Sequence, residues 1–369
     1  MRSRLSRTAV LELFAGTGGA SLGLHRAGWE AVACVERAPA AVRTLRAAGL
    51  PAVEADVNLV DFAAWAGKVD LLWASPPCQP GSMAGKRLGG QDERDGWPAT
   101  LRAIDEAQPS WFLAENVLGW SYHADACSLD RGGCPACHYT HVLDQISLRC
   151  SVSGVWRLDA ANFGVPQRRR RLIVWGGPLP LDEEGPAPTH AAPTEADGLG
   201  RAPWETLGEA VGDTLNRESC SARACYPCDG SHGRACSEPW RFEAPSPTLT
   251  TTEVKGTRAG APDWTFNGGP DRASDAAFLA AGIRRVTVQE ALILQGFPAD
   301  WPVQGTVEEQ YTQAGNAVPP PLAEAVARLV LVAHRAWSAL RGSGVDTVAL
   351  GRLIRRTGLV VPGHLGVRP

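Results

Sequence analysis

The sequence has no excess of positive charge and very little lysine. Its 369 residues carry 36 Lys and Arg against 39 Asp and Glu, a net charge of −3, and its lysines are Lys68, Lys86 and Lys255. Taken alone, this balance argues against a protein that coats nucleic acid. Arginine suits bidentate contacts with phosphates and bases better than lysine does, although coding bias accounts for its excess equally well.

Long hydrophobic runs are also absent. No apolar stretch reaches membrane-spanning length, and the basic residues 1–7 lead into a stretch that Glu12 interrupts, unlike a signal peptide. We therefore expect a cytoplasmic protein without membrane contact, in which ten cysteines indicate metal binding or catalysis before disulfides. The length and a hydrophobic content of 44% allow two domains, or one large domain with an insertion.

Short apolar runs alternate with helical patterns in the first half of the chain. This alternation predicts a doubly wound, Rossmann-like α/β fold, with a parallel sheet covered by helices on both faces. The expected strands are 8–13, 30–35, 69–74, 111–115, 154–158 and 171–175, and the expected helices are 20–27, 39–48 and 322–340.

The composition changes after residue 176. Residues 177–283 are rich in Pro, Gly, Ser and Thr, which predicts a smaller, irregular domain. Regular patterning returns at 284–340, and residues 341–369 form a tail with five basic residues and one Asp.

A glycine-rich segment, Phe14-Ala-Gly-Thr-Gly-Gly19, lies between the first expected strand and a helix. Its glycines let a ligand approach the backbone, and the helix N-terminus offers free N–H groups. Ser21 breaks the G-x-G-x-x-G pattern and no P-loop lysine follows, which argues against a pyrophosphate ligand. Glu36 ends the next strand, where an acid can hold ribose hydroxyls. The pattern favours a ribose-bearing ligand such as S-adenosylmethionine; a tight turn without a ligand is the alternative.

A single cysteine follows another expected strand, in the segment Ser75-Pro-Pro-Cys-Gln-Pro80. Cys78 would therefore lie at the carboxyl edge of the sheet, where such folds bind ligands. Two prolines stiffen the chain before it, and a thiolate there can act as a covalent nucleophile. The alternative is a small buried hydrophobe, which is our interpretation of Cys34.

These segments occur in the order typical of cytosine-5 DNA methyltransferases. The chain resembles this class I, S-adenosylmethionine-dependent family over residues 8–176 and 284–340. The shared motifs are FAGTGG at 14–19, PPCQ at 76–79, ENV at 115–117, QRRRR at 167–171, the block 285–298 and GNAV at 315–318. The resemblance implies that 1–176 and 284–340 form the catalytic domain, 177–283 the target-recognition region, and that double-stranded DNA is the substrate.

The resemblance also implies a covalent mechanism. Cys78 would add to carbon 6 of a flipped-out cytosine, which activates carbon 5 for methyl transfer. Glu115 would protonate or hydrogen-bond ring nitrogen 3, and Arg169 would contact and polarise the base. The residues expected to contact DNA or the base are Gln79, Ser82, Asn116, Gln167 and Arg171. Gly81 stands where the family has Phe, which puts local DNA contacts in doubt but leaves the thiol untouched.

The cofactor residues follow from the same resemblance. Phe14 would lie against the adenine ring, Glu36 would hold the ribose, and Asp56 would accept from the adenine amino group. The remaining cofactor residues are Gly16, Gly18, Gly19, Pro76, Asn316 and Val318. Asn316 and Val318 can reach this site only if the helix at 322–340 packs on the first domain.

Two groups of cysteines lie outside the family's motifs. They consist of Cys127, Cys134 and Cys137, with histidines nearby, and of Cys220, Cys225, Cys228 and Cys236. Each group has a C-x-x-C pair and can supply ligands for a structural zinc. One shared site and reduced, unliganded thiols are the alternatives.

We expect a monomeric DNA (cytosine-5-)-methyltransferase from restriction-modification or phage and host DNA modification. That setting implies a cognate restriction endonuclease as a partner. The alternatives are the same chemistry on RNA, since a few members of the family modify transfer RNA, and an inactive DNA-binding regulator. The sizeable variable region favours DNA, and intact Cys78, Glu115 and Arg169 favour an active enzyme.

Overall fold

The computed structural model describes residues 8–77, 95–122, 135–196, 200–211, 244–246, 248–249 and 287–343. The chain forms two compact units, each built from separate segments. Unit 1 comprises Met1–Leu158, Arg170–Ala187 and Leu322–Pro369, and unit 2 comprises Asp159–Arg169 and Pro188–Pro321. The sequence-based boundaries fall at other positions, and the assignment of 177–283 to target recognition stays a prediction.

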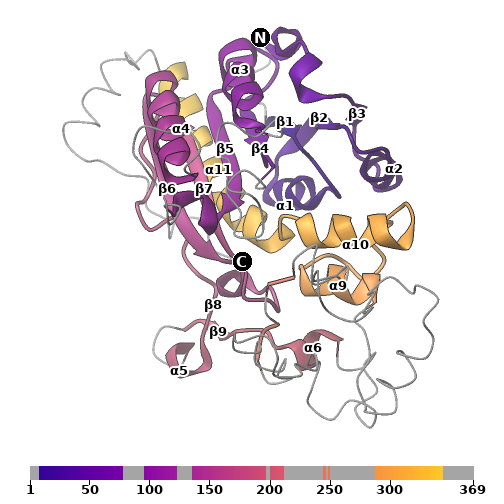
Figure 1. Ribbon diagram of the computed structural model, residues 1–369. Helices are drawn as coiled ribbons and strands as arrows, with labels where there is room; N and C mark the ends of the chain where they lie inside the picture. Colours follow the sequence, from indigo (N-terminus) through magenta and orange to yellow (C-terminus); the bar gives the residue numbers. More distant parts are fainter. Residues whose placement is uncertain are drawn as a thin grey trace. The chain divides into compact units, whose positions relative to one another are not determined.

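Unit 1 is built on a seven-stranded sheet with the order β3-β2-β1-β4-β5-β7-β6 (Figure 1). Its strands are β1 (Ala9–Leu13), β2 (Glu30–Glu36), β3 (Ala52–Glu54), β4 (Leu71–Ala74), β5 (Trp111–Val117), β6 (Val152–Asp159) and β7 (Arg170–Gly177). The first five strands pair in parallel, whereas β7 runs antiparallel to β5. The doubly wound α/β fold is confirmed, but the expectation of a wholly parallel sheet is wrong at β7.

The short link before β7 gives the physical reason for this difference. Only residues 160–169 connect the end of β6 to the start of β7. Parallel neighbours need a crossover of about a dozen or more residues, usually with a helix. The sequence pattern showed two further strands but did not show that this link is too short for such a crossover.

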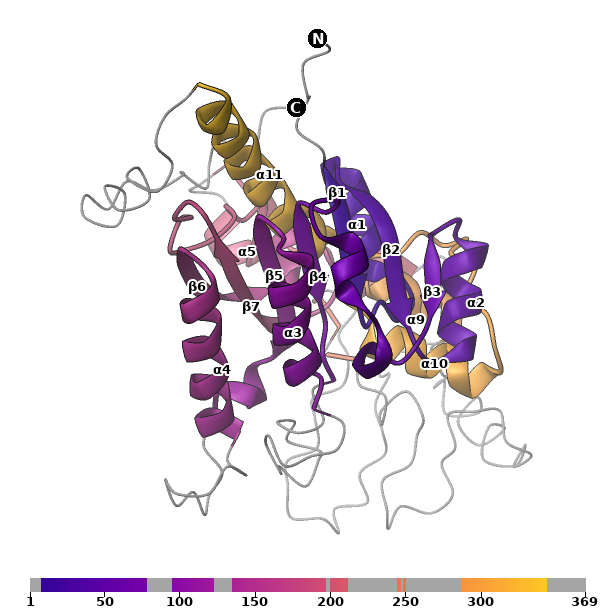
Figure 2. The same cartoon turned by 90° about the horizontal axis from the view of Figure 1, so that it is seen from above.

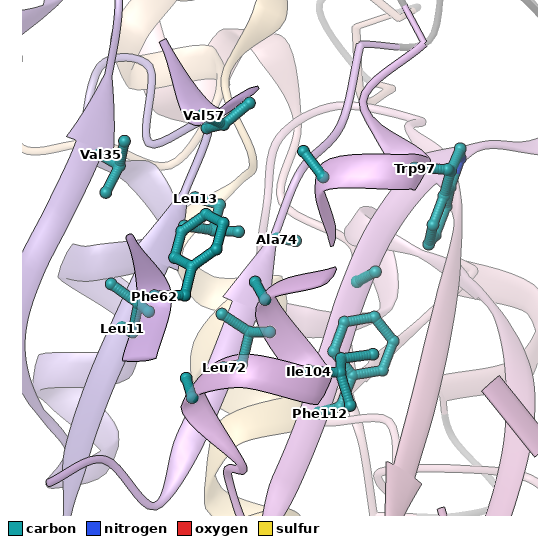
Figure 3. Packing of buried hydrophobic residues seen from close by; sticks show 14 of the residues in the cluster. Leu11, Leu13, Val35, Val57, Phe62, Leu72, Ala74, Trp97, Ile104 and Phe112 are labelled. Carbon is teal, nitrogen blue, oxygen red and sulfur yellow. The ribbon is translucent and has the colours of Figure 1, made fainter. Parts of the chain in front are cut away.

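Helices cover both faces of the sheet. On one face, α3 (Trp97–Ala107), α4 (Pro135–Arg149) and the 3-10 helix η2 (Phe62–Trp65) pack on a hydrophobic cluster. Figure 3 shows part of this cluster. Its strand residues include Leu11, Leu13, Leu72, Ala74, Phe112 and Ala114. These positions alternate along β1, β4 and β5, as expected for side chains on one face of a sheet.

The opposite face carries α1 (Gly19–Ala27), α2 (Pro39–Ala47) and α11 (Pro320–Gly342). Leu45 of α2 packs on Cys34 of β2, and Cys34 is fully buried, as predicted. The Nε1 of Trp29, just after α1, donates to the carbonyl of Ala327 in α11 at 3.0 Å. A helix from the C-terminal part of the chain therefore packs on this face of unit 1. In Figure 2, α11 lies behind the sheet.

Unit 2 contains shorter elements. They are η5 (Ala160–Phe163), β8 (His190–Ala191), α5 (Pro193–Ala196), β9 (Ala202–Pro203), α6 (Leu207–Val211), α9 (Val288–Leu294) and α10 (Val307–Asn316). β8 and β9 pair in parallel. Capping boxes start α9 at Thr287 and α10 at Thr306, because each threonine and the glutamate three residues later satisfy each other's backbone N–H. No helix in the described part of the chain is long and apolar enough to cross a membrane.

Candidate active site

The predicted site residues of unit 1 lie along one edge of its sheet. Leu13 of β1 is level with Val35 of β2 and with Ala74 of β4, and Ala74 is level with Ala114 of β5. The strands are parallel, so their carboxyl ends share this edge, which is the usual ligand-binding edge of such folds. The residues that follow at this edge are Phe14, Glu36, Ser75 and Glu115.

The glycine-rich turn leaves β1 in a conformation that exposes backbone. Phe14, Gly16 and Gly18 have φ values of 57°, 54° and 85°, in the left-handed region that favours glycine. Gly18 caps α1, which begins at Gly19. A Cβ placed on Gly16 would meet no atom of the described residues within 4 Å. The turn therefore fits a ligand that lies directly against the main chain.

Glu36 is fixed at this turn by three backbone donors. Its carboxylate accepts from the backbone N–H of Gly16 at 2.9 Å and from those of Arg37 and Ala38 at 2.8 Å each. A carboxylate offers about four lone-pair sites, so one remains for a ligand hydroxyl. Asp56 caps the 3-10 helix η1 (Val57–Leu59), and its Oδ1 accepts from the backbone and side-chain nitrogens of Asn58 at 2.9 Å each.

Asn116 joins the end of β5 to the chain just before Cys78. Its Nδ2 donates to the carbonyl of Pro76 at 3.3 Å, and its Oδ1 accepts from the backbone N–H of Val117 at 2.8 Å. Cys78, Gln79 and Ser82 lie outside the described residues. The structure thus fixes the chain two residues before the predicted nucleophile.

Glu115 forms a buried ion pair with Arg171. The Nε of Arg171 lies 2.7 Å from Oε1 of Glu115, and the two side chains are 9% and 11% exposed. The antiparallel pairing of β5 with β7 produces this contact, since it sets Val117 opposite Arg171. A charge-assisted pair shielded from water holds both groups in one geometry. The family motifs predict both residues at the site but do not predict that they pair.

The arginine run alternates between buried and exposed positions. Arg169 and Arg171 are buried with Gln167, whereas Arg168 and Arg170 are exposed, as the period of an extended chain predicts. Arg168 forms an ion pair with Asp159 at 2.7 Å.

Arg169 and Gln167 belong to unit 2, and both hold backbone there. The guanidinium of Arg169 is buried and donates to the carbonyls of Leu249, Gly315 and Ala317 at 2.9–3.0 Å. The amide of Gln167 donates to the carbonyl of Leu294 and accepts from the N–H of Leu249, both at 3.1 Å. The predicted contacts of these two residues with the base and DNA therefore gain no support.

Asn316 and Val318 also lie in unit 2. Asn316 ends α10 and is exposed, whereas Val318 is buried. Their contribution to the cofactor site stays a prediction.

The zinc prediction gains no support either. Of its seven cysteines only Cys137 is described, half-buried in α4, and the others lie outside the described residues. No group of three or more His, Cys, Asp or Glu side chains in the described part of the chain could hold a metal. The neighbouring His138 uses both of its ring nitrogens in contacts with Asp95 and Trp120.

Glu12 is a buried acid whose role the sequence analysis missed. It lies on β1 directly behind the glycine-rich turn, 1% exposed, and contacts Ser21 of α1 and Cys34 of β2. Burial raises the pKa of Glu12 to about 8, and hydrogen bonds from Ser21 and Cys34 offset this only in part. The signal for it in the sequence is an acid in the middle of an apolar strand.

Comparisons with known proteins agree with this geometry. A family model described as C-5 cytosine-specific DNA methylase matches residues 8–331. The type II methyltransferase M.NgoMIV of Neisseria gonorrhoeae is 32% identical over 345 residues, covering 88% of this chain and 97% of that protein. M.PspPI of Psychrobacter sp. (strain TA137) is 32% identical over 340 residues, covering 88% and 79%. The solved structure of S. pombe Dnmt2 methyltransferase has a TM-score of 0.59 at 18% identity, covering 89% and 99%.

The mixed seven-stranded sheet, with the glycine-rich turn at its carboxyl edge, has a Rossmann-like α/β fold, which the S. pombe Dnmt2 structure shares. The chain belongs to the C-5 cytosine-specific DNA methylase family, and it is a DNA cytosine methyltransferase.

Proposed function

We propose that this enzyme methylates carbon 5 of a cytosine flipped out of double-stranded DNA, through a covalent bond between Cys78 and carbon 6. S-adenosylmethionine supplies the methyl group from its sulfonium. The observation that carries the proposal is the buried Glu115–Arg171 pair, at the sheet edge that also carries the glycine-rich turn and Pro76. Membership of the family supports the same chemistry.

The residues divide the reaction between them. The thiolate of Cys78 forms a bond to carbon 6, and the displaced electron pair moves toward carbon 5 and ring nitrogen 3. Glu115 takes up a proton as the base binds and donates it to nitrogen 3, which neutralises that charge, and Arg171 holds Glu115 in place. Carbon 5 would then bond to the methyl group as the bond between that methyl and the sulfonium sulfur breaks, and S-adenosylhomocysteine would leave. Loss of the proton from carbon 5 to a base would then re-form the ring double bond and expel the thiolate of Cys78 from carbon 6. The base must leave the stack for this, at a cost of a few kcal/mol.

The base-polarising role expected of Arg169 is better suited to Arg171. The guanidinium of Arg171 is 2.7 Å from the Glu115 carboxylate, so its positive charge is next to the group that meets the base. Arg169 donates to three carbonyls and supports the backbone instead. This assignment makes Arg171 the arginine that polarises the cytosine.

The cofactor site rests on residues of the same edge. Phe14 contacts the adenine, Glu36 holds the ribose, and Asp56 accepts from the adenine amino group. The main chain at Gly16, Gly18 and Gly19 and the ring of Pro76 line the remaining part. The open space beside Gly16 and the fixed carboxylate of Glu36 support this arrangement. The assignment of Asn316 and Val318 to the cofactor site rests on the family resemblance alone.

The relatives suggest the biological setting. M.NgoMIV and M.PspPI are both named type II methyltransferases, which supports a role in restriction-modification. In that setting a cognate endonuclease cuts the same DNA site when it is unmethylated, and residues 177–283 would recognise the site.

One experiment tests the substrate and the covalent step together. The protein is incubated with labelled S-adenosylmethionine and either double-stranded DNA or transfer RNA. We expect label in DNA only, and label in RNA alone would overturn the DNA assignment.

DNA that carries 5-fluorocytosine cannot lose a proton from carbon 5, so a covalent complex should survive denaturation. If the enzyme methylates normal DNA but forms no stable complex with the same sequence carrying 5-fluorocytosine, the covalent step is wrong. Bisulfite sequencing of host DNA identifies the target.

The Glu36 carboxylate should be required for cofactor binding. Glu36→Ala removes the acceptor for the N–H of Gly16 and the predicted ribose contact. Hydrogen bonds to charged groups contribute about 1.5–3 kcal/mol, so we expect S-adenosylmethionine to bind about 10- to 100-fold more weakly in calorimetric titrations. Glu54→Ala is the matched control, because Glu54 lies opposite Glu36 on β3 but pairs with Arg46 at 3.5 Å. Equal affinities of both variants would contradict the ribose assignment.

A further inference from the structure

A closed network of four residues lies at the start of α3, outside the shared motifs named above. Asp95 accepts from the backbone N–H of Trp97 at 3.1 Å, and its other oxygen lies 3.1 Å from Nε2 of His138. Trp120 donates from Nε1 to Nδ1 of His138 at 3.1 Å. Trp120 also stacks on Trp97, with ring centroids 4.5 Å apart and planes 14° apart. The four groups therefore hold one another in a ring of contacts, all within unit 1.

The two hydrogen bonds of the His138 ring determine its tautomer. Its Nδ1 accepts from an indole N–H, which is a donor only, so the ring proton must be on Nε2, where it donates to Asp95. The side chains of His138 and Asp95 are each 8% exposed. Water can therefore replace neither bond easily, and loss of one partner leaves a buried polar group unsatisfied.

Gly96 connects this network to the glycine-rich turn by direct packing. It lies between Asp95 and Trp97 and packs directly on Phe14 and Pro76. A Cβ on Gly96 would lie 2.6 Å from Cζ of Phe14 and 3.0 Å from Cβ of Pro76. Real Cβ atoms essentially never approach so closely, so the ring of Phe14 has no room to move toward the start of α3. Trp97 itself is anchored in the hydrophobic cluster under the sheet (Figure 3).

We propose that the Asp95–His138–Trp120 network positions the ring of Phe14 for the adenine of S-adenosylmethionine. This rests on the proposed cofactor role of Phe14. His138 is a positioning residue in this scheme: it does not touch the cofactor, but it holds Asp95 and Trp120. Asp95 in turn binds the backbone N–H of Trp97, next to Gly96, and Trp120 stacks on the ring of Trp97. Disrupting it should weaken cofactor binding and leave the chemical step intact once the cofactor is saturating.

The test measures cofactor affinity and the chemical step separately. For His138→Leu we expect the Kd for S-adenosylmethionine, measured without DNA, to rise about tenfold or more. The kcat at saturating cofactor should stay within about threefold of the wild type. A purely structural defect would lower the melting temperature and the number of binding sites in a titration, but it would not change the Kd of the folded fraction.

Further variants separate the contacts. His138→Gln keeps a donor toward Asp95 and should recover part of the affinity. His141→Leu is the matched control: it lies one turn later on α4, is exposed, and should bind like the wild type. If His138→Leu does not fold, Trp120→Phe removes a single hydrogen bond and keeps the ring stack. Gly96→Ala leaves the network intact but crowds Phe14, and should raise the same Kd.

Three outcomes would overturn the proposal. Unchanged Kd values in folded His138, Trp120 and Gly96 variants would show that Phe14 is positioned without the network. A fall in kcat with an unchanged Kd would show that the network acts on the chemical step instead. A wild-type protein that binds no S-adenosylmethionine would overturn the proposed function and this inference with it. The wild-type control therefore distinguishes the two failures.

Discussion

Glu115→Gln is expected to lower the rate of methyl transfer by about 10²- to 10⁴-fold, the usual contribution of a positioned general acid or base. Glutamine matches the shape of the side chain and can still accept from Arg171, but it has no proton to deliver to ring nitrogen 3. The ion pair of 2.7 Å is lost. Since no residue of the proposed cofactor site changes, S-adenosylmethionine should bind as in the wild type. Single-turnover methylation with enzyme in excess over DNA measures the step directly.

Three comparisons make this result specific. Cys78→Ala should transfer no methyl group and sets the lower limit of the assay. Arg171→Met should also be slow, and in addition less stable, because it leaves the carboxylate of Glu115 buried and unpaired; breaking a buried pair costs about 3–5 kcal/mol. Arg170→Gln is the matched control, as Arg170 is the exposed neighbour in the same strand. A wild-type rate in Glu115→Gln would remove Glu115 from the mechanism.

Local patterns were sufficient to predict much of unit 1. The apolar runs at 9–13, 71–74 and 111–117 are strands because they are short, buried on both faces and bounded by turn residues. Position along the chain then placed Phe14, Glu36 and Glu115 at one edge, because parallel strands share their carboxyl edge. The alternation of the arginine run follows from the period of two in an extended chain.

The contacts that the sequence did not predict are between distant segments. Arg169 and Arg171 look equivalent in the sequence, since both match the motif and both point inward. Their partners differ because β7 begins at Arg170: Arg171 meets Glu115 across the strand pair, and Arg169 meets the carbonyls of Gly315 and Ala317. His138 likewise lies beside Cys134 and Cys137 in the sequence, but in helix α4 its ring contacts Asp95, which is distant in the chain. No periodicity encodes such pairings.

Glu12→Gln is expected to stabilise the protein, and by more at higher pH. Burial raises the pKa of Glu12 from its usual value of 4.5 to about 8, with the negative charge of Glu36 adding to the effect. Between these two values the native state keeps a proton that the unfolded chain releases. The contribution of Glu12 to stability is therefore most favourable below about pH 4.5 and is lost as the pH rises through about 8. One pKa unit corresponds to about 1.4 kcal/mol, so the acid costs roughly 3 kcal/mol at pH 7.

Glutamine removes this cost because it is neutral in both states and can still bond to Ser21 and Cys34. The stability difference between Glu12→Gln and the wild type should be under about 1 kcal/mol at pH 5 and rise to several kcal/mol near pH 8. Denaturant unfolding at four pH values between 5 and 8 measures it. Glu30→Gln, an exposed acid at the start of the neighbouring strand, should show no such trend. Parallel pH profiles for the wild type and Glu12→Gln would mean that Glu12 is ionised in the folded protein. The contact with Ser21 would then be a charge-assisted hydrogen bond that supports the turn, and the substitution would destabilise the protein instead.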